Sequence, residues 1–366
     1  MLGISLSYVS NETPAGWDAP LAKFKAGGVT DIFYNVLAGG AHYNSAIYPQ
    51  SSAMKGGFDS LSYAIGSAHE LGMRVHAWLS FGAYIPYMNK AFSISTGAFA
   101  DFGNPDAREA MRAITAEIVE MYPEVDGVIF DYMRYPTMND SAYYSEDDVT
   151  RAMEGCTGEI PYNMDIFTSV KPYHGNPTEW GQRWDLWYAN ALVDYVVPMC
   201  YSPFYYDNFE QSITWWTETA GVPRSSIIPK LSVIDTHSEN EASHKTDEVL
   251  AAELIYWQQF GFSHLSVFDQ RATVEQLTAI GALLPEEPEE NEMGIYDTLI
   301  AEADAIDARA TTEANTAQAD YDARMANVAA AHLTATNLRI QAAALQEADE
   351  KAAQVADAAA AVSALL

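Results

Sequence analysis

An aspartate and an arginine follow an apolar run in the segment GVIFDYMRYP, residues 127–136. Asp131 ends a stretch of buried-type residues, and Arg134 stands three positions further on. A charge beside apolar neighbours is costly to bury unless a partner or a catalytic task accompanies it. Two interpretations follow: Asp131 is a catalytic carboxylate, or Asp131 and Arg134 form an ion pair that fixes a loop.

The elements around this segment alternate short apolar strands with amphipathic helical stretches from residue 1 to about residue 284. This alternation favours a parallel sheet with helical crossovers. A helix is predicted at about 104–122, because Asn104 is a good N-cap and Pro105 suits the first helical position. Eight strands are expected, at 3–9, 30–37, 74–81, 127–132, 164–170, 193–201, 226–233 and 264–269.

Eight strands with intervening helices over about 280 residues match the size of an α/β fold of the (β/α)8 TIM-barrel type. A doubly wound open sheet is the alternative, and it usually carries a Gly-rich phosphate-binding turn after its first strand. The segment SYVSNETPAGW contains no G-x-G-x-x-G. The sequence therefore favours a barrel over residues 1–284.

In a barrel, catalytic and binding groups stand at the C-terminal ends of the strands. Asp235 and Asp269 follow the two last strands, so they are the candidates for a second catalytic carboxylate beside Asp131. Other strand ends carry aromatic, amide, imidazole and amine groups that suit sugar faces and hydroxyls, although any single aromatic fits the core as well. The candidate substrate-binding residues at these ends are Tyr34, Asn35, His76, Trp78, Lys171, His174 and Tyr201.

The composition excludes several classes of function. With 50 acidic against 19 basic residues and a net charge of −31, no basic stripe is expected for nucleic acid or for an anionic membrane surface. Solubility is the simpler explanation of this acidity, and adaptation to high salt is the alternative. No stretch approaches the roughly 18 apolar residues of a membrane span. The histidines lack metal-site spacing and no G-x-S-x-G is present, so neither a metal, a cofactor nor a serine nucleophile is expected.

The composition changes after residue 284. LPEEPEENEMG, residues 284–294, holds two prolines and five glutamates, which is typical of a linker. We therefore predict a linker at residues 285–294. Residues 295–366 contain no Gly or Pro and are rich in Ala at three- and four-residue steps, which predicts an α-helical, coiled-coil-like extension. This spacing gives the helix a narrow apolar seam, which predicts self-association or docking to another structural protein. A helical hairpin folded on itself is the alternative.

The segment GVIFDYMRYP resembles the fourth-strand signature of the glycoside-hydrolase-like TIM barrels. Three further segments resemble the same family in the same order: RVHAWLSF, GNPDAREAMRAITAEIVEMYPEVDG and GQRWDLWYANALVDYVVPMCYSP. The resemblance implies a polysaccharide-directed barrel in which Asp131 is catalytic and Arg134 orients it, with His76, Trp78 and Tyr201 lining the cleft. This sequence departs from the family pattern at two places. Tyr132 stands where a second Asp is common, and the fifth strand ends without Glu.

Two alternative functions therefore remain for the barrel. The first is hydrolysis of a glycosidic bond, and the second is glycan binding or a structural role without turnover. The N-terminal segment MLGISLSYVS has no pattern of an export signal. A glycan-directed barrel with an assembly helix and no such signal favours a virion component, for example a viral tail protein. A cytoplasmic enzyme with an oligomerising tail is the alternative.

Overall fold

The computed structural model describes residues 1–7, 13–52, 54, 57–94, 99–136, 145–172, 180–201, 209–234 and 244–284. The chain divides into two compact units, and the first comprises Met1–Tyr188 and Leu192–Pro285. The predicted linker at 285–294 and the predicted helical extension at 295–366 lie outside the described residues, so both stay predictions.

Eight parallel strands form one sheet in the order β6-β5-β4-β3-β2-β1-β8-β7. Two isolated bridges, from Val196 to Ile227 and from Met199 to Lys230, join β6 to the chain at β7 and nearly close the sheet into a barrel. Each strand overlaps a predicted one, which confirms the eight-stranded barrel. The strands are β1 (Leu2–Leu6), β2 (Asp31–Asn35), β3 (Arg74–Ser80), β4 (Gly127–Asp131), β5 (Asp165–Val170), β6 (Tyr195–Pro198), β7 (Lys230–Ser232) and β8 (Leu265–Phe268).

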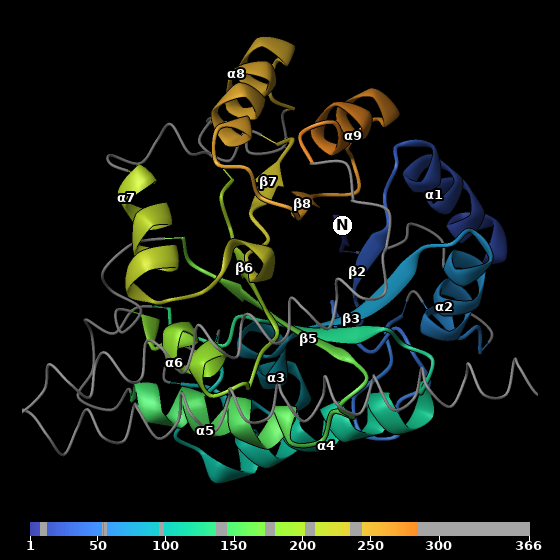
Figure 1. Ribbon diagram of the computed structural model, residues 1–366. Coiled ribbons are helices and arrows are strands. Elements are labelled where there is room, and N and C mark those ends of the chain that lie inside the picture. The colour runs from blue at the N-terminus through green and yellow to red at the C-terminus, as the bar shows by residue number, and fades with distance from the viewer. Residues whose placement is uncertain are drawn as a thin grey trace, which may run out of the picture. The chain divides into compact units, whose positions relative to one another are not determined.

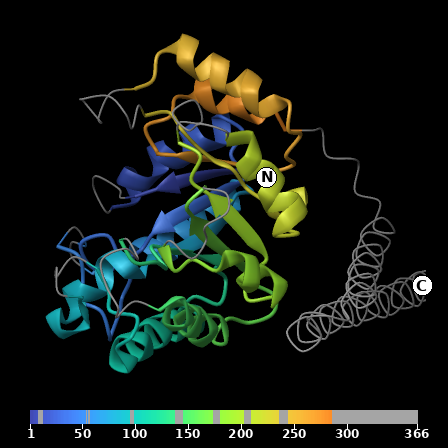
Figure 2. The ribbon, with the colours of Figure 1, turned by 90° about the vertical axis from the view of Figure 1, so that its left-hand side faces the viewer.

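Helices surround the strands, as Figures 1 and 2 show from two directions. No helix in the described part of the chain is both long and apolar enough to cross a membrane. The α-helices are α1 (Pro14–Ala26), α2 (Ser60–Glu70), α3 (Phe81–Met88), α4 (Pro105–Met121), α5 (Glu146–Thr157), α6 (Trp184–Ala189), α7 (Phe209–Thr214), α8 (Asp247–Gln258) and α9 (Val274–Gly281). Short helices of other types are η1 (Lys90–Phe92), η4 (Trp215–Thr219) and η5 (Arg224–Ser226).

The helix predicted at 104–122 is α4. The Asn104 side chain accepts a hydrogen bond of 2.9 Å from the backbone N–H of Asp106, and Pro105 occupies the first turn. The apolar face of α4 is buried. Another helix, α3, was not predicted from the sequence. The helix α3 begins at Phe81, the last residue of the strand expected at 74–81, so strand and helix follow each other without a loop.

The barrel interior is filled by one inward-facing residue from each of several strands, because side chains alternate between the two faces of a strand. This interior cluster contains Met1, Phe33, Trp78, Ile129, Phe167, Val197 and Ile228. Residues two positions further along a strand face the same way. Asp131 therefore points inward above Ile129, and Lys230 points inward above Ile228.

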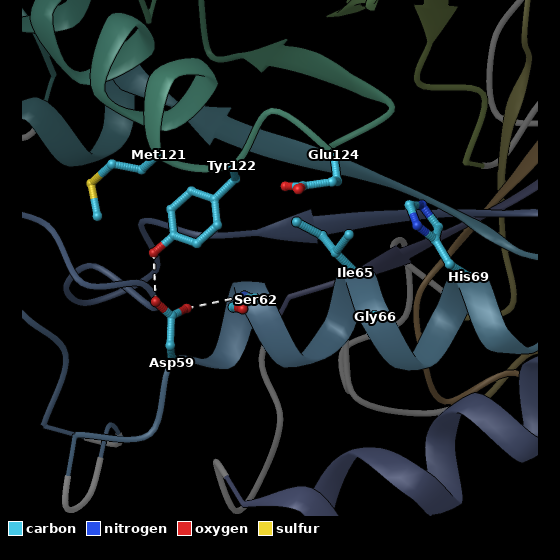
Figure 3. A pocket seen from close by; sticks show the side chains of 8 residues that line it. All are labelled: Asp59, Ser62, Ile65, Gly66, His69, Met121, Tyr122 and Glu124. Carbon is cyan, nitrogen blue, oxygen red and sulfur yellow. Dashed lines mark hydrogen bonds between the residues drawn. The ribbon is translucent and has the colours of Figure 1, made fainter.

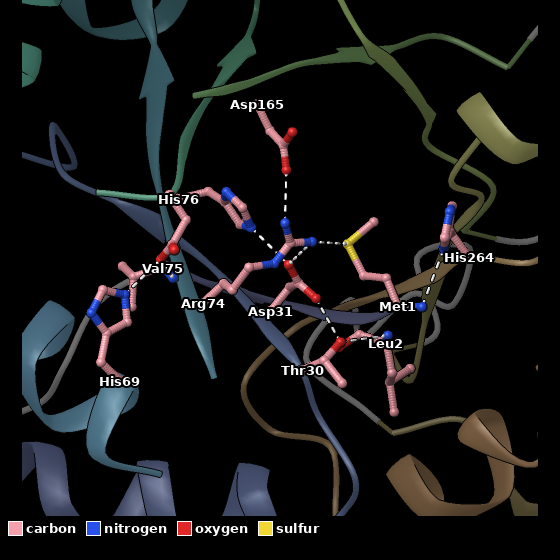
Figure 4. Close-up of polar contacts among 11 residues, drawn as sticks. Met1, Leu2, Thr30, Asp31, His69, Arg74, Val75, His76, Asp165 and His264 are labelled. Atoms are coloured by element: carbon pink, nitrogen blue, oxygen red, sulfur yellow. Dashed lines mark hydrogen bonds and ion pairs between the residues drawn. The ribbon is translucent and has the colours of Figure 1, made fainter. Parts of the chain in front are cut away.

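A buried polar cluster lies where the strands begin, around Asp31 (Figure 4). Asp31 Oδ1 lies 2.8 Å from His76 Nε2 and 2.7 Å from Arg74 Nη2, and Arg74 also pairs with Asp165 at 2.8 Å. Burial opposes ionisation of Asp31, but the hydrogen bond with His76 and the charge of Arg74 outweigh burial and lower its pKa. This cluster ties the start of β2 to those of β3 and β5.

We predict that Asp31→Asn costs about 3 kcal/mol of unfolding free energy, because it removes the buried carboxylate that binds the fully buried His76 and pairs with Arg74. Asp165→Asn is the matched control: Asp165 binds the same arginine but is 29% exposed, so it should cost below about 1 kcal/mol. Chemical denaturation at pH 7 measures both. Because the pKa of Asp31 is lowered on folding, the loss should shrink as the pH falls below the ordinary value of 3.8. Equal losses for the two variants would contradict the assignment.

Candidate active site

Asp131 is the last residue of β4, and its side chain is 4% exposed. Its Oδ2 accepts a hydrogen bond of 3.1 Å from Trp78 Nε1 on the neighbouring strand β3. Its Oδ1 accepts one of 2.7 Å from the backbone N–H of Tyr132. The carboxylate is thus held in one orientation at the C-terminal end of the barrel, where sequence analysis expected it.

The turn after Asp131 has an unusual backbone. Tyr132 has a φ of 56°, in the left-handed region that bulky residues rarely adopt. Gly82, in the first turn of α3, packs against this turn, and a Cβ there would lie 2.0 Å from the Tyr132 carbonyl oxygen. Only glycine therefore allows α3 to approach so closely, and this contact helps to fix the end of β4.

Arg134 is 7% exposed and does not form the ion pair with Asp131 that its spacing suggested; among the described residues, no carboxylate pairs with it. Its guanidinium carbon lies 4.7 Å from the centre of the Tyr132 ring and 5.7 Å from that of Trp180. Its Nε has no hydrogen-bond partner. Burial lowers the pKa of Arg134, and the charge of Asp131 opposes that shift, so the two groups act on each other through space.

Lys230, at the start of β7, is fully buried and was missed by sequence analysis. Its Nζ donates a hydrogen bond of 2.9 Å to Ser169 Oγ and lies 5.1 Å from the centre of the Trp78 ring. Burial lowers the pKa of Lys230 to about 8, against the opposing charge of Asp131. A lysine within the otherwise apolar predicted strand 226–233 was the signal that could have identified it.

Lys171 follows β5 and adds another cation. Its Nζ lies 5.1 Å from the centre of the Trp180 ring. Its backbone N–H donates to Gln182 Oε1 at 3.0 Å, and Gln182 Nε2 donates to the carbonyl oxygen of Ser169 at 3.2 Å. Burial lowers the pKa of Lys171, and the nearby charge of Arg134 lowers it further. Gln182 thereby joins the strand end that carries Lys171 to the serine that binds Lys230.

Two more predicted residues lie at the same end of the barrel. Tyr201 stacks on Phe268 with ring centres 5.0 Å apart, and burial, together with the charge of Asp131, raises the pKa of its phenol. Asn35 ends β2, where its Nδ2 donates to Ser80 Oγ at 3.4 Å and its Oδ1 accepts from the backbone of Leu37 at 3.2 Å. Tyr201 adds an aromatic face to the site, and Asn35 adds an amide.

The structure corrects two predicted substrate contacts. Tyr34 points outward from β2, where its hydroxyl donates to Ser60 Oγ at 3.0 Å and its ring meets Trp17 edge-on at 4.8 Å. It is completely buried under α1 and α2 and is out of reach of a ligand in the barrel. His76 does face the interior, but it pairs in register with Gly127, the first residue of β4, and binds Asp31 at the opposite end from Asp131.

The structure describes one of the two candidates for a second catalytic carboxylate. Asp269 follows β8 and is 6% exposed, and both of its oxygens bind the Arg271 side chain, at 3.0 and 2.8 Å. The other candidate, Asp235, lies outside the described residues, as does the predicted sugar contact His174. No group of His, Cys, Asp and Glu among the described residues could hold a metal ion.

We use the name Asp131 cluster for six side chains at the C-terminal end of the barrel: Trp78, Asp131, Arg134, Lys171, Tyr201 and Lys230. It combines one carboxylate with three basic groups and two aromatic rings. Five strands, β3 to β7, carry its members or lead directly into them. Such a cluster can transfer a proton, bind negative charge and stack against a flat ligand face.

A separate hollow of about 460 Å³ lies between α2 and the end of α4 (Figure 3). At one end of it, Asp59 accepts hydrogen bonds from the Tyr122 hydroxyl at 2.6 Å and from the backbone of Ser62 at 3.0 Å. Its described lining is Asp59, Ser62, Ile65, Gly66, His69, Met121, Tyr122 and Glu124, and none of these belongs to the Asp131 cluster.

Several known proteins resemble this chain in sequence or in fold. No protein-family model matches the chain. A curated protein of Escherichia coli K12 named Glycosyl hydrolase DigH is 23% identical over 270 residues, covering 55% of this chain and 61% of that protein. A protein of the same name from Shigella flexneri matches to the same extent. The chain thus spans less than two thirds of the length of these relatives.

Solved structures share the fold at low sequence identity. Alpha-L-fucosidase isoenzyme 2 from Paenibacillus thiaminolyticus has a TM-score of 0.56 at 15% identity, covering 76% of this chain and 48% of that one. A chitinase from Rhizomucor miehei has a TM-score of 0.52 at 12% identity, covering 77% of this chain and 99% of that one. These likenesses show the TIM-barrel fold, and in sequence the chain is similar to proteins named Glycosyl hydrolase.

We predict that Lys230→Met stabilises the fold at pH 7 by about 1–3 kcal/mol, because it removes a buried ammonium whose pKa is lowered from 10.5 to about 8. Folding disfavours the proton on Lys230, so the wild type should gain stability as the pH rises from about 8 towards 10.5. The variant should lack this gain. Denaturant unfolding at pH 7 and pH 10 measures both effects, and equal pH slopes for the two proteins would refute the prediction.

Proposed function

We propose that this barrel hydrolyses a glycosidic bond in a polysaccharide and that the reaction takes place at the Asp131 cluster. One observation carries the proposal. A buried carboxylate, oriented by Trp78, ends the fourth strand at the end of the barrel where TIM-barrel enzymes carry their active sites. The likeness of the chain to proteins named Glycosyl hydrolase supports this reaction class.

In this proposal, Asp131 acts as the nucleophile or as the general base of the reaction. Glycoside hydrolysis normally uses two carboxyl groups, about 5 Å apart when configuration is retained and further apart when it is inverted. Asp269 and Asp235 are the two candidates for the acid partner. Because Asp269 is already bound by Arg271, its use as an acid would require that this pair open.

The remaining side chains of the cluster suit sugar binding. Sugars present hydroxyl groups to polar side chains and C–H faces to aromatic rings. The ring of Tyr201 and the rings of Tyr132 and Trp180, which lie beside Arg134, are only partly buried. The Trp78 indole is occupied by Asp131 and Lys230, so we assign it to positioning the carboxylate.

Glycan binding without turnover is the second candidate function. The observation that favours it is the state of the carboxylates: among the described residues, Asp269 is the other acid that follows a late strand, and Arg271 already binds both of its oxygens. A barrel with a single available carboxylate can still recognise a glycan. The substitution experiment below separates the two functions.

For the remainder of the chain, we propose that residues 295–366 attach the barrel to an assembly of several copies or to another structural protein. Ala-rich spacing without Gly or Pro supports this proposal. A virion tail component remains our proposed setting, with a cytoplasmic oligomeric enzyme as the alternative.

We predict that Asp131→Asn lowers the release of reducing sugar by about 10³-fold, because the amide can neither accept a proton nor act as a nucleophile. Asp165→Asn is the matched control, since Asp165 starts the strand next to β4 and lies at the opposite end of the barrel. The assay uses a panel of cell-surface polysaccharides at low and at high salt. Turnover by Asp131→Asn at the wild-type rate would overturn the proposed role, and silence from the wild type with retained binding would favour the second function.

We predict that the fragment 1–284 sediments as a monomer and keeps the specific activity of the full chain, because the barrel forms a compact unit of its own. The full chain should sediment as an oligomer or bind a structural partner. Sedimentation velocity and the reducing-sugar assay test the two parts. A full chain that is monomeric at every concentration and binds no structural partner would contradict the assembly role.

A further inference from the structure

The charges of the Asp131 cluster do not balance. Arg134, Lys171 and Lys230 each interact electrostatically with Asp131, which is the only carboxylate within the cluster. Arg134 is 7% exposed with an unsatisfied Nε, and Lys230 is fully buried with a serine hydroxyl as its hydrogen-bond partner. Among the described residues, two buried cations and one half-buried cation stand around one anion, and this leaves uncompensated positive charge, which costs stability.

Several other buried or half-buried cations in the described part of this chain are neutralised by neighbouring acids. Lys245 pairs with Glu253 at 2.6 Å, and Arg74 pairs with Asp31 at 2.7 Å. Arg183 pairs with Glu146 at 3.0 Å. In a chain with 50 acidic and only 19 basic residues, carboxylate partners are abundant. Within the described residues, the Asp131 cluster therefore differs from these pairs in holding more cations than carboxylates.

We propose that the Asp131 cluster binds a sugar that carries a negatively charged group, such as the carboxylate of a uronic acid or a sulfate ester. This inference rests on the proposed function and names its substrate class. The bound anion supplies the negative charge that the three cations lack, and the rings around them face the sugar. Arg134 contributes a planar donor fork that matches an oxyanion, and Lys171 contributes a mobile ammonium.

Long-range electrostatics opposes this binding and makes the local cluster necessary. A chain with a net charge of −31 repels a polyanion at distances beyond the immediate contact. At about 0.1 M salt the screening length is about 10 Å, so this repulsion fades while contacts with buried cations persist. Binding of an acidic glycan should therefore tolerate salt rather than decline with it as binding to a basic surface would.

Isothermal titration of the full chain with matched oligosaccharides tests the inference. The probes are oligouronates of several linkages, the same oligosaccharides after reduction of their carboxyl groups, and sulfated forms of the reduced oligosaccharides. The titrations use Asp131→Asn, so turnover does not consume the probe and the result does not depend on hydrolysis. We expect at least one acidic series to bind about 10-fold or more tightly than its neutral counterpart.

A pair of lysine variants locates the effect. Lys171→Met removes a cation whose described side-chain contact is the Trp180 ring, and its backbone hydrogen bond to Gln182 is retained. It should reduce affinity for the acidic probe about 10-fold and leave affinity for the neutral probe unchanged, which a purely structural defect would not do. Lys25→Met is the control, because Lys25 is exposed in the last turn of α1.

The outcomes are distinct from those of the proposed function. Equal affinity for acidic and neutral probes, failure of every acidic probe to bind, or the same effect from Lys25→Met as from Lys171→Met would each overturn the inference. A clear acidic preference in a protein that hydrolyses nothing would uphold the inference and defeat the proposed function. Hydrolysis of neutral glycans without any acidic preference would do the reverse. The sulfated probe distinguishes a general oxyanion preference from one for carboxylates.

Discussion

The C-terminal end of this barrel depends on one constraint: the buried carboxylate of Asp131 stands among cations. Asp131 is held at the end of β4 by Trp78 and by its own turn, which bind its two oxygens. Lys230, in turn, is tolerated in the interior because Asp131 and Ser169 offset part of the cost of its burial. Side chains point alternately into and out of the barrel along each strand. This alternation brings these groups to one place although they are distant in sequence.

The two ends of the barrel treat charge differently. Around Asp31, where the strands begin, each charged side chain has an opposite partner at close range, and the cluster ties three strands together. Around Asp131, where they end, the cations outnumber the carboxylate. Complete pairing is what stability requires, whereas incomplete pairing leaves capacity for a ligand. The contrast matches the division of TIM barrels into a stabilising face and an active face.

Sequence patterns predicted the elements better than the directions of individual side chains. Strand periodicity and the Asn104 cap identified all eight strands and α4, and the predicted strand positions brought Asp131 and Trp78 to the same end of the barrel. Tyr34 was misassigned because a shift of one residue along a strand turns a side chain to the other face. The depth of His76 depends on strand stagger, and the Arg134 contacts depend on Trp180, which is distant in sequence; no local pattern shows either.

The structure of Asp131→Asn with a bound oligosaccharide tests the central claim most directly. The account predicts a sugar ring at the C-terminal end of the barrel, in contact with Asn at position 131 and with at least one of Lys171 and Arg134. It also predicts that Trp78 keeps its place beside Lys230. A sugar bound instead in the hollow between α2 and α4, or anywhere outside the Asp131 cluster, would contradict the account.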